Sequence, residues 1–214
     1  MYVPRHFQQH DWPAIKRVID ENSFATLVSC HAGTPIATHL PMRLVEAAPG
    51  SWRLQGHVSR ANPHWRQFDQ EQKSLAIFAG PHSYVSPRWY AQVNVPTWNY
   101  ISVHVYGKPR VVSDPGDLYE LMKGLVDKFE GHMEAERRYT LESLPAEFLE
   151  SQLKGIVAFE IAVEEVQASF KLSQNRDQRD HDNVIVELGK SGDQDAHRVA
   201  QAMSCPYAEG SKHV

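Results

Sequence analysis

The chain has 214 residues, of which 42 % are hydrophobic and 22 % are charged, and its formal net charge is −4. These values are typical of a soluble globular protein with one large domain or two small ones. They exclude a small disulfide-stabilised protein, a coiled coil and a disordered chain.

The first predicted element is a helix over residues 12–22. Its apolar residues repeat at helical spacing, and Asp11 precedes it as a candidate N-cap. Runs rich in β-branched and aromatic residues then predict antiparallel strands, joined by turns at Gly33 and Gly50. These strands are expected over residues 24–30, 36–44 and 52–58.

A short helix is expected from Asn62 or Pro63, followed by a buried strand over residues 75–79. A proline-containing loop through Pro81 and Pro87 separates this strand from the later elements. Those elements are expected at residues 98–106 (strand), 114–129 (helix), 156–166 and 166–172 (strands), and 177–188 and 193–203 (helices).

Tight turns separate most of these strands, which favours an antiparallel barrel or sandwich of at least six strands over a parallel sheet. The sequence has no glycine-rich motif of the kind that binds nucleotides in doubly wound folds. The fold class is therefore expected to be mainly β with peripheral helices.

The two cysteines, Cys30 and Cys205, form no C-x-x-C pair, so neither a zinc site nor a disulfide framework is expected. Among the twelve histidines the only H-x-x-x-H pair is His6 with His10, and we predict no metal site. No apolar run reaches the roughly 18 residues of a membrane span, and the first ten residues contain no apolar signal segment. These observations predict a cytoplasmic protein that does not insert into a membrane.

The densest polar cluster is Gly56-His57-Val58-Ser59-Arg60-Ala61-Asn62-Pro63-His64-Trp65, where a strand is expected to end and a helix to begin. The N–H groups of a helix N-terminus, together with Ser59, Arg60 and Asn62, would suit a phosphate group. The alternative is an ordinary strand-to-helix turn in which Asn62 caps the helix.

Three further clusters combine aromatic, hydroxyl, amide and cationic side chains. They span residues 80–90, 95–100 and 171–176. Aromatic surfaces with amide donors and cations suit a flat anionic ligand. Alternatively, the aromatic residues belong to the core, and Lys171 and Arg176 lie on a solvated strand edge. No G-x-S-x-G motif is present, so a hydrolase with a serine nucleophile is not expected.

Six blocks of sequence occur in an order that resembles the PaiB-type negative transcriptional regulators, a family of FMN-binding split barrels. The blocks are Met1–Phe7, Thr38–Pro41, Gly56–Trp65, Tyr84–Tyr90, Val95–Tyr100 and Lys171–Arg176. The resemblance implies a six-stranded antiparallel split β-barrel over residues 1–176. The helices expected after it predict a C-terminal helical extension, residues 177–214, packed on the barrel. It also implies a homodimer that binds FMN in a groove between its subunits.

The resemblance further implies which residues contact the flavin. Those beside the isoalloxazine ring would be Thr38, His39 and Leu40. Those facing the ribityl phosphate would be Arg60 and Asn62, with His57 nearby. Ser86 would lie in a loop near the ligand, and the residues approaching from the partner subunit would be Thr97 and Asn99. The site would be closed by Lys171, Gln174 and Arg176.

The function expected from this resemblance is that of an FMN-binding flavoprotein of a transcriptional regulator family, with a redox or sensing role. The alternatives are a flavin-dependent oxidoreductase of the pyridoxine phosphate oxidase-like group and a haem-handling split-barrel protein. Residues 1–107 carry a net charge of +3 and residues 108–214 one of −7. Because the total is negative and neither a helix-turn-helix motif nor a basic stripe is recognisable, the charge gives direct DNA binding no support.

Overall fold

The computed structural model describes residues 1–68 and 72–204. The chain folds into two compact units, each assembled from segments that are far apart in the sequence. Among the described residues, the first unit consists of residues 1–22, 78–104 and 167–204, and the second unit consists of residues 23–68, 72–77 and 105–166.

The second unit is built mainly of strands. It holds the start of β4, the end of β5 and five whole strands, which are β1 (Phe24–His31), β2 (Thr34–Ala48), β3 (Ser51–Ser59), β6 (Pro109–Val111) and β7 (Ile156–Ala162). Their hydrogen-bonded order is β6-β7-β3-β2-β1-β4, and all five pairings are antiparallel.

A two-residue turn joins β1 to β2. Ala32 and Gly33 both have positive φ angles, of 47° and 81°. Two positive φ angles are the signature of the type I′ hairpin turn, whose twist matches that of the strands beside it. The turn predicted at Gly33 is therefore confirmed, and it fixes the pairing of Thr34 with His31.

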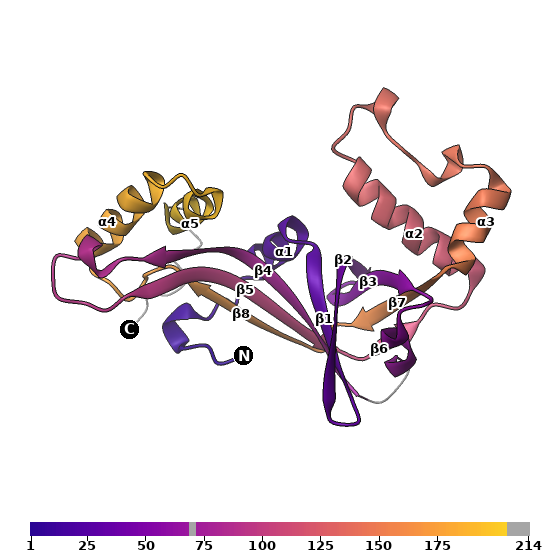
Figure 1. Cartoon of the computed structure of the whole chain (residues 1–214), viewed down its shortest axis with the longest axis horizontal. Helices are drawn as coiled ribbons and strands as arrows, with labels where there is room; N and C mark the ends of the chain where they lie inside the picture. The colour runs from indigo at the N-terminus through magenta and orange to yellow at the C-terminus, as the bar shows by residue number, and fades with distance from the viewer. Residues whose placement is uncertain (69–71, 205–214) are drawn as a thin grey trace. The chain divides into compact units, whose positions relative to one another are not determined.

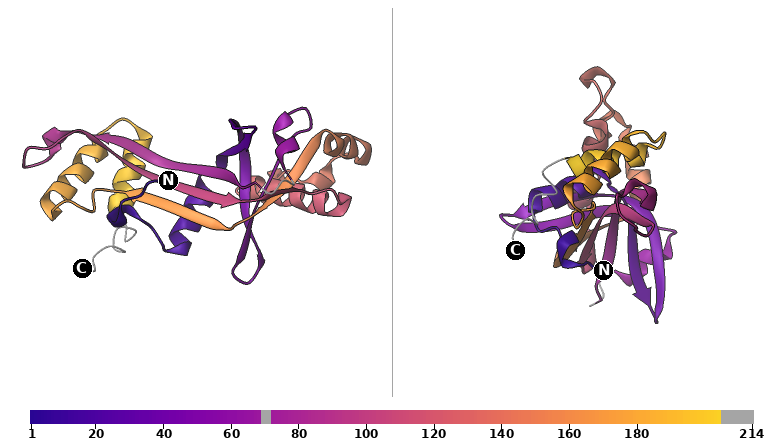
Figure 2. Two further views of the ribbon diagram at one scale, coloured as in Figure 1. Left: turned by 90° about the horizontal axis from the view of Figure 1, so that it is seen from below. Right: turned by 90° about the vertical axis from the view of Figure 1, so that its left-hand side faces the viewer.

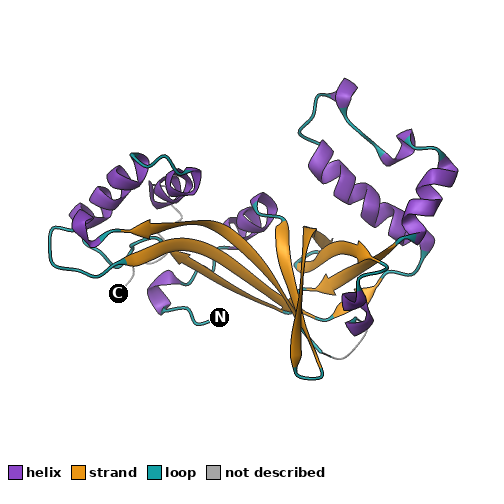
Figure 3. Cartoon of the chain, viewed as in Figure 1, coloured by secondary structure: helices purple, strands orange, loops and turns teal. Residues whose placement is uncertain are grey.

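Alternating burial places one face of this sheet in the core. Along β3, Leu54 and Val58 are buried, whereas the residues between them on the opposite face are half-buried. On α2 (Pro115–Glu130), the apolar stripe expected from the sequence buries Leu121 and Leu125 against Ala158 of β7. In Figure 3, α2 and α3 (Ala146–Lys154) lie next to β7.

The first unit contains α1 (Trp12–Glu21), most of the strands β4 (Ser74–Val85), β5 (Thr97–Gly107) and β8 (Glu165–Lys171), and the helices α4 (Gln178–Gly189) and α5 (Gln194–Ser204). The predicted N-cap of α1 is confirmed, because the Asp11 carboxylate accepts a hydrogen bond from the Ala14 N–H at 3.0 Å. Helices α4 and α5 pack against each other beside β4 and β5 (Figure 1, Figure 2). The 3₁₀ helices of the chain are η1 (Arg5–Phe7), η2 (Pro63–Gln67), η3 (Pro87–Trp89), η4 (Ala135–Arg137) and η5 (Leu141–Ser143).

The structure corrects the predicted strand count: the described residues form eight strands, in the order β6-β7-β3-β2-β1-β4-β5-β8, and not six. Among the eight, β6 is the strand that matches none of the ranges expected from the sequence, because its three residues are too few to produce an alternating pattern. The loop expected at Pro81 is also wrong, because β4 continues through it to Val85. β1 pairs with β4 only over Leu75–Ile77, so the edge of β4 after Ile77 forms no ladder with β1. Pro81 lies in this later part of β4, where its missing N–H is tolerated.

Helix α3 was not predicted either, and the strand expected over residues 156–166 ends at Ala162. Both predicted helices after residue 176 are present as α4 and α5. The last ten residues of the predicted C-terminal extension, which include Cys205, lie outside the described residues. The domain boundary at residue 176 stays a prediction. In the part of the chain that the structure describes, no helix is long and apolar enough to cross a membrane.

Candidate functional site

A buried histidine connects three elements of the second unit. His64, in η2, is 0 % exposed. Its Nδ1 lies 2.8 Å from the Thr38 hydroxyl on β2, and its Nε2 lies 2.8 Å from the Ser29 hydroxyl on β1. The Ser29 hydroxyl in turn lies 2.6 Å from that of Ser74 at the start of β4. One imidazole ring thus fixes the position of Thr38.

The Thr38 hydroxyl makes a second hydrogen bond. The Asn62 side-chain amide donates a hydrogen bond to Thr38 Oγ1 at 3.2 Å, and its oxygen accepts one from the His64 N–H at 3.0 Å. Burial lowers the pKa of His64, so the ring is neutral near pH 7, with one nitrogen donating and the other accepting. Asn62, His64 and Thr38 therefore form one polar network at the end of β3.

This network borders an open strand edge. β1 pairs with β2 from Thr34 to Pro41, but β3 pairs with β2 only from Met42 to Ala48. Over residues 34–41, the second edge of β2 therefore faces no strand among the described residues. Every other residue on such an edge presents its backbone N–H and C=O groups outward, where a ligand with donors and acceptors along one side can bind them.

Arg60 follows directly after β3 and is exposed. Its Nε and Nη2 donate hydrogen bonds of 2.8 Å to the backbone oxygens of Lys154 and Ile156. A guanidinium has five N–H donors, so these two bonds hold the group in place and leave others for an anion.

The helix expected beside Arg60 is a short 3₁₀ helix, η2. Residues 63–67 form a single five-residue 3₁₀ helix, and the Asn62 side chain caps it by accepting from the His64 N–H. The alternative interpretation, a capped strand-to-helix turn, therefore describes this segment. Any phosphate here would depend on side chains and not on a helix dipole.

The other candidates in the second unit lie on both faces of the sheet. Leu40 is 3 % exposed and Thr38 is half-buried, but His39 between them is exposed on the opposite face, where it stacks on Phe24 with ring centroids 6.3 Å apart. His57 is half-buried, and its buried Nδ1 has no hydrogen-bond partner among the described residues. Burial lowers the pKa of His57.

The first unit holds the remaining candidates, and three of them, Thr97, Asn99 and Lys171, form hydrogen bonds within it. The Lys171 ammonium donates to the Thr97 hydroxyl at 2.5 Å, and burial together with Arg176 lowers the lysine's pKa. Asn99 is 0 % exposed, and its amide nitrogen donates to the Ser173 hydroxyl at 2.9 Å. Asn99 is thus part of the core of this unit.

Gln174 and Ser86 make local contacts. The Gln174 side chain accepts from the Leu172 N–H at 2.7 Å and donates to the Phe170 carbonyl, so it stabilises the bend after β8. Ser86 caps η3 by accepting from the Arg88 N–H at 3.3 Å. Contact of any first-unit candidate with flavin stays a prediction.

Arg176 and Lys171 are the two cations of this group. The Arg176 guanidinium lies 4.9 Å from the centre of the Tyr90 ring and donates to the Asn94 side chain at 3.2 Å. The aromatic stack supports the cation from one side, so the arginine is held in place and not freely solvated.

A polar hollow of about 420 Å³ lies under α2 in the second unit. Arg53 and Gln55 contact Glu160 at 2.8 and 2.6 Å, and Arg110 lies 3.7 Å from the same carboxylate. These contacts form one ion network on the wall of the hollow. In the described parts of the chain, no group of three or more His, Cys, Asp or Glu side chains is arranged to hold a metal ion.

Sequence reasoning missed the central role of His64 and its partners Ser29 and Ser74. These hydroxyls lie 35 and 45 residues from the residues they contact, and the histidine lies 26 residues from Thr38. The only available signal was the position of His64 two residues after a candidate N-cap.

The neutral, buried His64 predicts that acid destabilises the fold. The unfolded chain binds a proton at this residue near pH 6.5, whereas the folded chain binds it only at lower pH, so its contribution to stability is complete above pH 6.5 and is lost as the pH falls toward the folded pKa. We expect the free energy of unfolding to fall by up to about 1.4 kcal/mol per pH unit from this group. Urea denaturation at pH 7.5 and 5.5 measures this change in the free energy of unfolding. If the His64→Gln protein shows the same pH dependence as wild type, the change does not come from His64.

Comparisons with known proteins come from sequence and from structure. A family model described as "Putative FMN-binding domain" matches residues 1–165. A Bacillus subtilis protein named "Protease synthase and sporulation protein PAI 2" is 40 % identical over 203 residues, which cover 95 % of this chain and 96 % of that protein. An uncharacterised protein of Saccharomyces cerevisiae, YKL070W, is 30 % identical over 153 residues, 61 % of this chain and 90 % of its own.

Two solved structures are similar in fold. The flavocytochrome Anf3 from Azotobacter vinelandii has a TM-score of 0.60 and 16 % identity, and the match covers 85 % of this chain and 78 % of that one. The FAD and heme binding protein from Mycobacterium smegmatis has a TM-score of 0.58 and 18 % identity, with 77 % and 73 % covered. At such identities the likeness concerns the fold alone.

Proposed function

Because the chain belongs to the PaiB-type FMN-binding family, we propose that it is a flavoprotein that binds FMN at the open edge of β2 and uses it in a redox or sensing role. The observation that carries the proposal is the stretch of β2 over residues 34–41 that pairs with β1 alone. Bound FMN would supply electron-transfer chemistry, and the chain would supply binding and orientation.

The residues present fit such a ligand. The isoalloxazine ring has donors and acceptors along one edge, which the backbone groups around Thr38 and Leu40 can meet. The contact of Thr38 with both His64 and Asn62 holds this part of the strand in a single geometry, so the donors are oriented before the ligand arrives. Arg60, anchored to the carbonyls of residues 154 and 156, supports the phosphate end with a fixed cation.

Titration of the purified protein with FMN, followed by quenching of flavin fluorescence, tests the proposal. We expect saturable binding with one FMN per chain. Riboflavin, which lacks the phosphate, should bind about tenfold more weakly or worse, because it loses a charge-assisted contact. Equal affinity for the two flavins would remove the phosphate contact from the proposal, and absence of quenching by either would refute it.

The absorption spectrum and two activity assays separate the related functions. Flavin gives bands in the near-ultraviolet and blue, whereas a Soret band would indicate the haem-handling alternative. Oxidation of NAD(P)H by the FMN-loaded protein would support a redox role, and retardation of DNA in gels at stated salt concentration would support a regulator that binds DNA itself.

We also propose that the protein is a homodimer, as the family resemblance implies. Support comes from an exposed aromatic surface in the first unit, where Trp98 is 52 % and Tyr84 is 43 % exposed and their ring centres lie 6.0 Å apart. Sedimentation should give twice the mass of one chain, and Trp98→Glu should shift the protein toward the monomer. Tyr2→Glu, at a position that is 88 % exposed, is the control. A wild-type monomer at tens of micromolar would contradict this proposal.

A further inference from the structure

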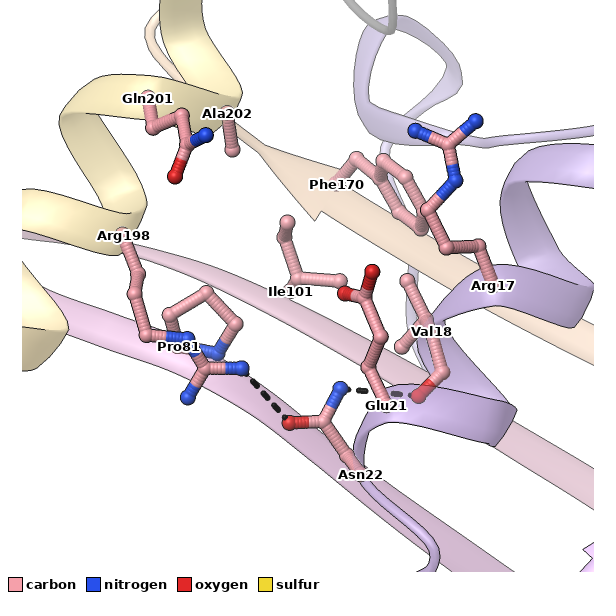
Figure 4. A pocket seen from close by; sticks show the side chains of 10 residues that line it. All are labelled: Arg17, Val18, Glu21, Asn22, Pro81, Ile101, Phe170, Arg198, Gln201 and Ala202. Atoms are coloured by element: carbon pink, nitrogen blue, oxygen red, sulfur yellow. Dashed lines mark hydrogen bonds between the residues drawn. The ribbon is translucent and has the colours of Figure 1, made fainter. Parts of the chain in front are cut away.

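A separate pocket of about 170 Å³ lies in the first unit between α1, α5 and the strands (Figure 4). Its floor is apolar: Val18, Pro81, Ile101 and Phe170 are all buried. For comparison, an apolar cavity of about 150 Å³ can hold a benzene molecule. The pocket is therefore the right size for the side chain of a small ligand.

The rim of the pocket is charged and polar, with α1 on one side and α5 on the other (Figure 4). Arg198 on α5 donates to the Asn22 side-chain oxygen at 3.1 Å and to the Asp195 carboxylate at 3.3 Å. These two bonds hold the guanidinium at the rim, and its other N–H groups are available to a carboxylate.

The opposite charge at the rim is Glu21, an exposed residue at the C-terminal end of α1. In the part of the chain that the structure describes, neither the Glu21 carboxylate nor the Gln201 amide makes a hydrogen bond or an ion pair. Figure 4 shows Glu21 among the residues that line the pocket. Glu21 is also the last residue of α1, where the partial negative charge of the helix end disfavours a carboxylate and favours a cation.

The apolar floor, the Arg198 guanidinium and the Glu21 carboxylate together define one kind of ligand. A simple carboxylic acid would meet Arg198 but would be repelled by Glu21, and a simple amine would meet Glu21 but would be repelled by Arg17 and Arg198. A ligand that carries an ammonium, a carboxylate and a short apolar chain matches the whole pocket. We propose that this pocket binds an apolar α-amino acid of about the size of leucine, with its ammonium at Glu21, its carboxylate at Arg198 and its side chain on the apolar floor.

The proposal does not depend on flavin binding, and it is tested without a flavin signal. Isothermal titration calorimetry on the full-length protein would compare L-leucine with 4-methylpentanoate, which lacks the amine, and with 3-methylbutylamine, which lacks the carboxylate. We expect saturable binding of L-leucine, with each analogue about tenfold weaker or worse, because each loses one charge-assisted contact. No binding of leucine at millimolar concentration, or equal binding of either analogue, would overturn the proposal.

Two substitutions test which residue binds the ammonium of the ligand and which binds its carboxylate. Glu21→Gln should remove the preference for leucine over 4-methylpentanoate, and Arg198→Gln should remove the preference for leucine over 3-methylbutylamine. The matched controls are Glu147→Gln and Arg179→Gln, exposed residues on α3 and α4 that do not line the pocket. Thermal melting of each variant shows that it is folded. If both pocket variants keep the wild-type preferences, the amino acid binds elsewhere and the assignment is wrong.

Discussion

Replacing His64 with alanine is expected to lower the free energy of unfolding by about 3 kcal/mol. The imidazole is fully buried, and its removal leaves the hydroxyls of Thr38 and Ser29 without their shared partner and opens a cavity next to Phe68. An unsatisfied buried polar group costs about 1 to 3 kcal/mol, and the lost packing adds to that. Urea denaturation of both proteins at pH 7.5 gives the difference.

The control for this experiment is His197→Ala, an exposed histidine on α5, for which we expect a change below about 0.5 kcal/mol. His64→Gln retains a donor and an acceptor and should recover part of the loss. If His64 also orients Thr38 for FMN, the folded His64→Gln protein should bind FMN more weakly than wild type does. A stable His64→Ala protein would show that the network does not support the fold.

Replacing Arg60 with alanine is expected to weaken FMN binding by tenfold or more, about 1.5 to 3 kcal/mol, through loss of a charge-assisted contact with the phosphate. Affinity for riboflavin should change much less, because riboflavin has no phosphate. The ratio of the two affinities, measured by fluorescence quenching, therefore isolates the role of the cation from any general effect on the fold.

A local structural effect must be separated from this result, since Arg60 also holds the carbonyls of Lys154 and Ile156. Arg60→Lys keeps the charge and should retain part of the discrimination between FMN and riboflavin. Arg137→Ala removes an exposed arginine elsewhere in the second unit and should leave both affinities unchanged. If Arg60→Ala binds FMN as wild type does, the phosphate lies somewhere else.

The sequence was sufficient for features that depend on neighbouring residues. The caps at Asp11 and Asn62 and the turn at Gly33 follow from local side-chain chemistry and from the freedom of glycine at positive φ, and all three are present. The apolar stripe of α2 follows from helical spacing in the same way.

Features that depend on strand register could not be predicted in this way. The meeting of His64 with Ser29 and Thr38 requires the pairing of β1 with β2, which no local pattern specifies. For the same reason the opposite orientation of His39 relative to Leu40 emerges only once the face of β2 that enters the core is known. Pro81 misled the prediction because the part of β4 beyond its ladder with β1 tolerates proline as well as a loop does.

The connectivity of the two units limits how the protein can be dissected. β4 passes from the second unit to the first after Ile77, and β5 returns after His104, so neither unit is a continuous piece of chain. A gene truncated at residue 165, where the family match stops, would delete most of β8 and all of α4 and α5, and with them one wall of the leucine-sized pocket. Deletion mutants would therefore disturb both units at once, and only point substitutions can assign a separate activity to each.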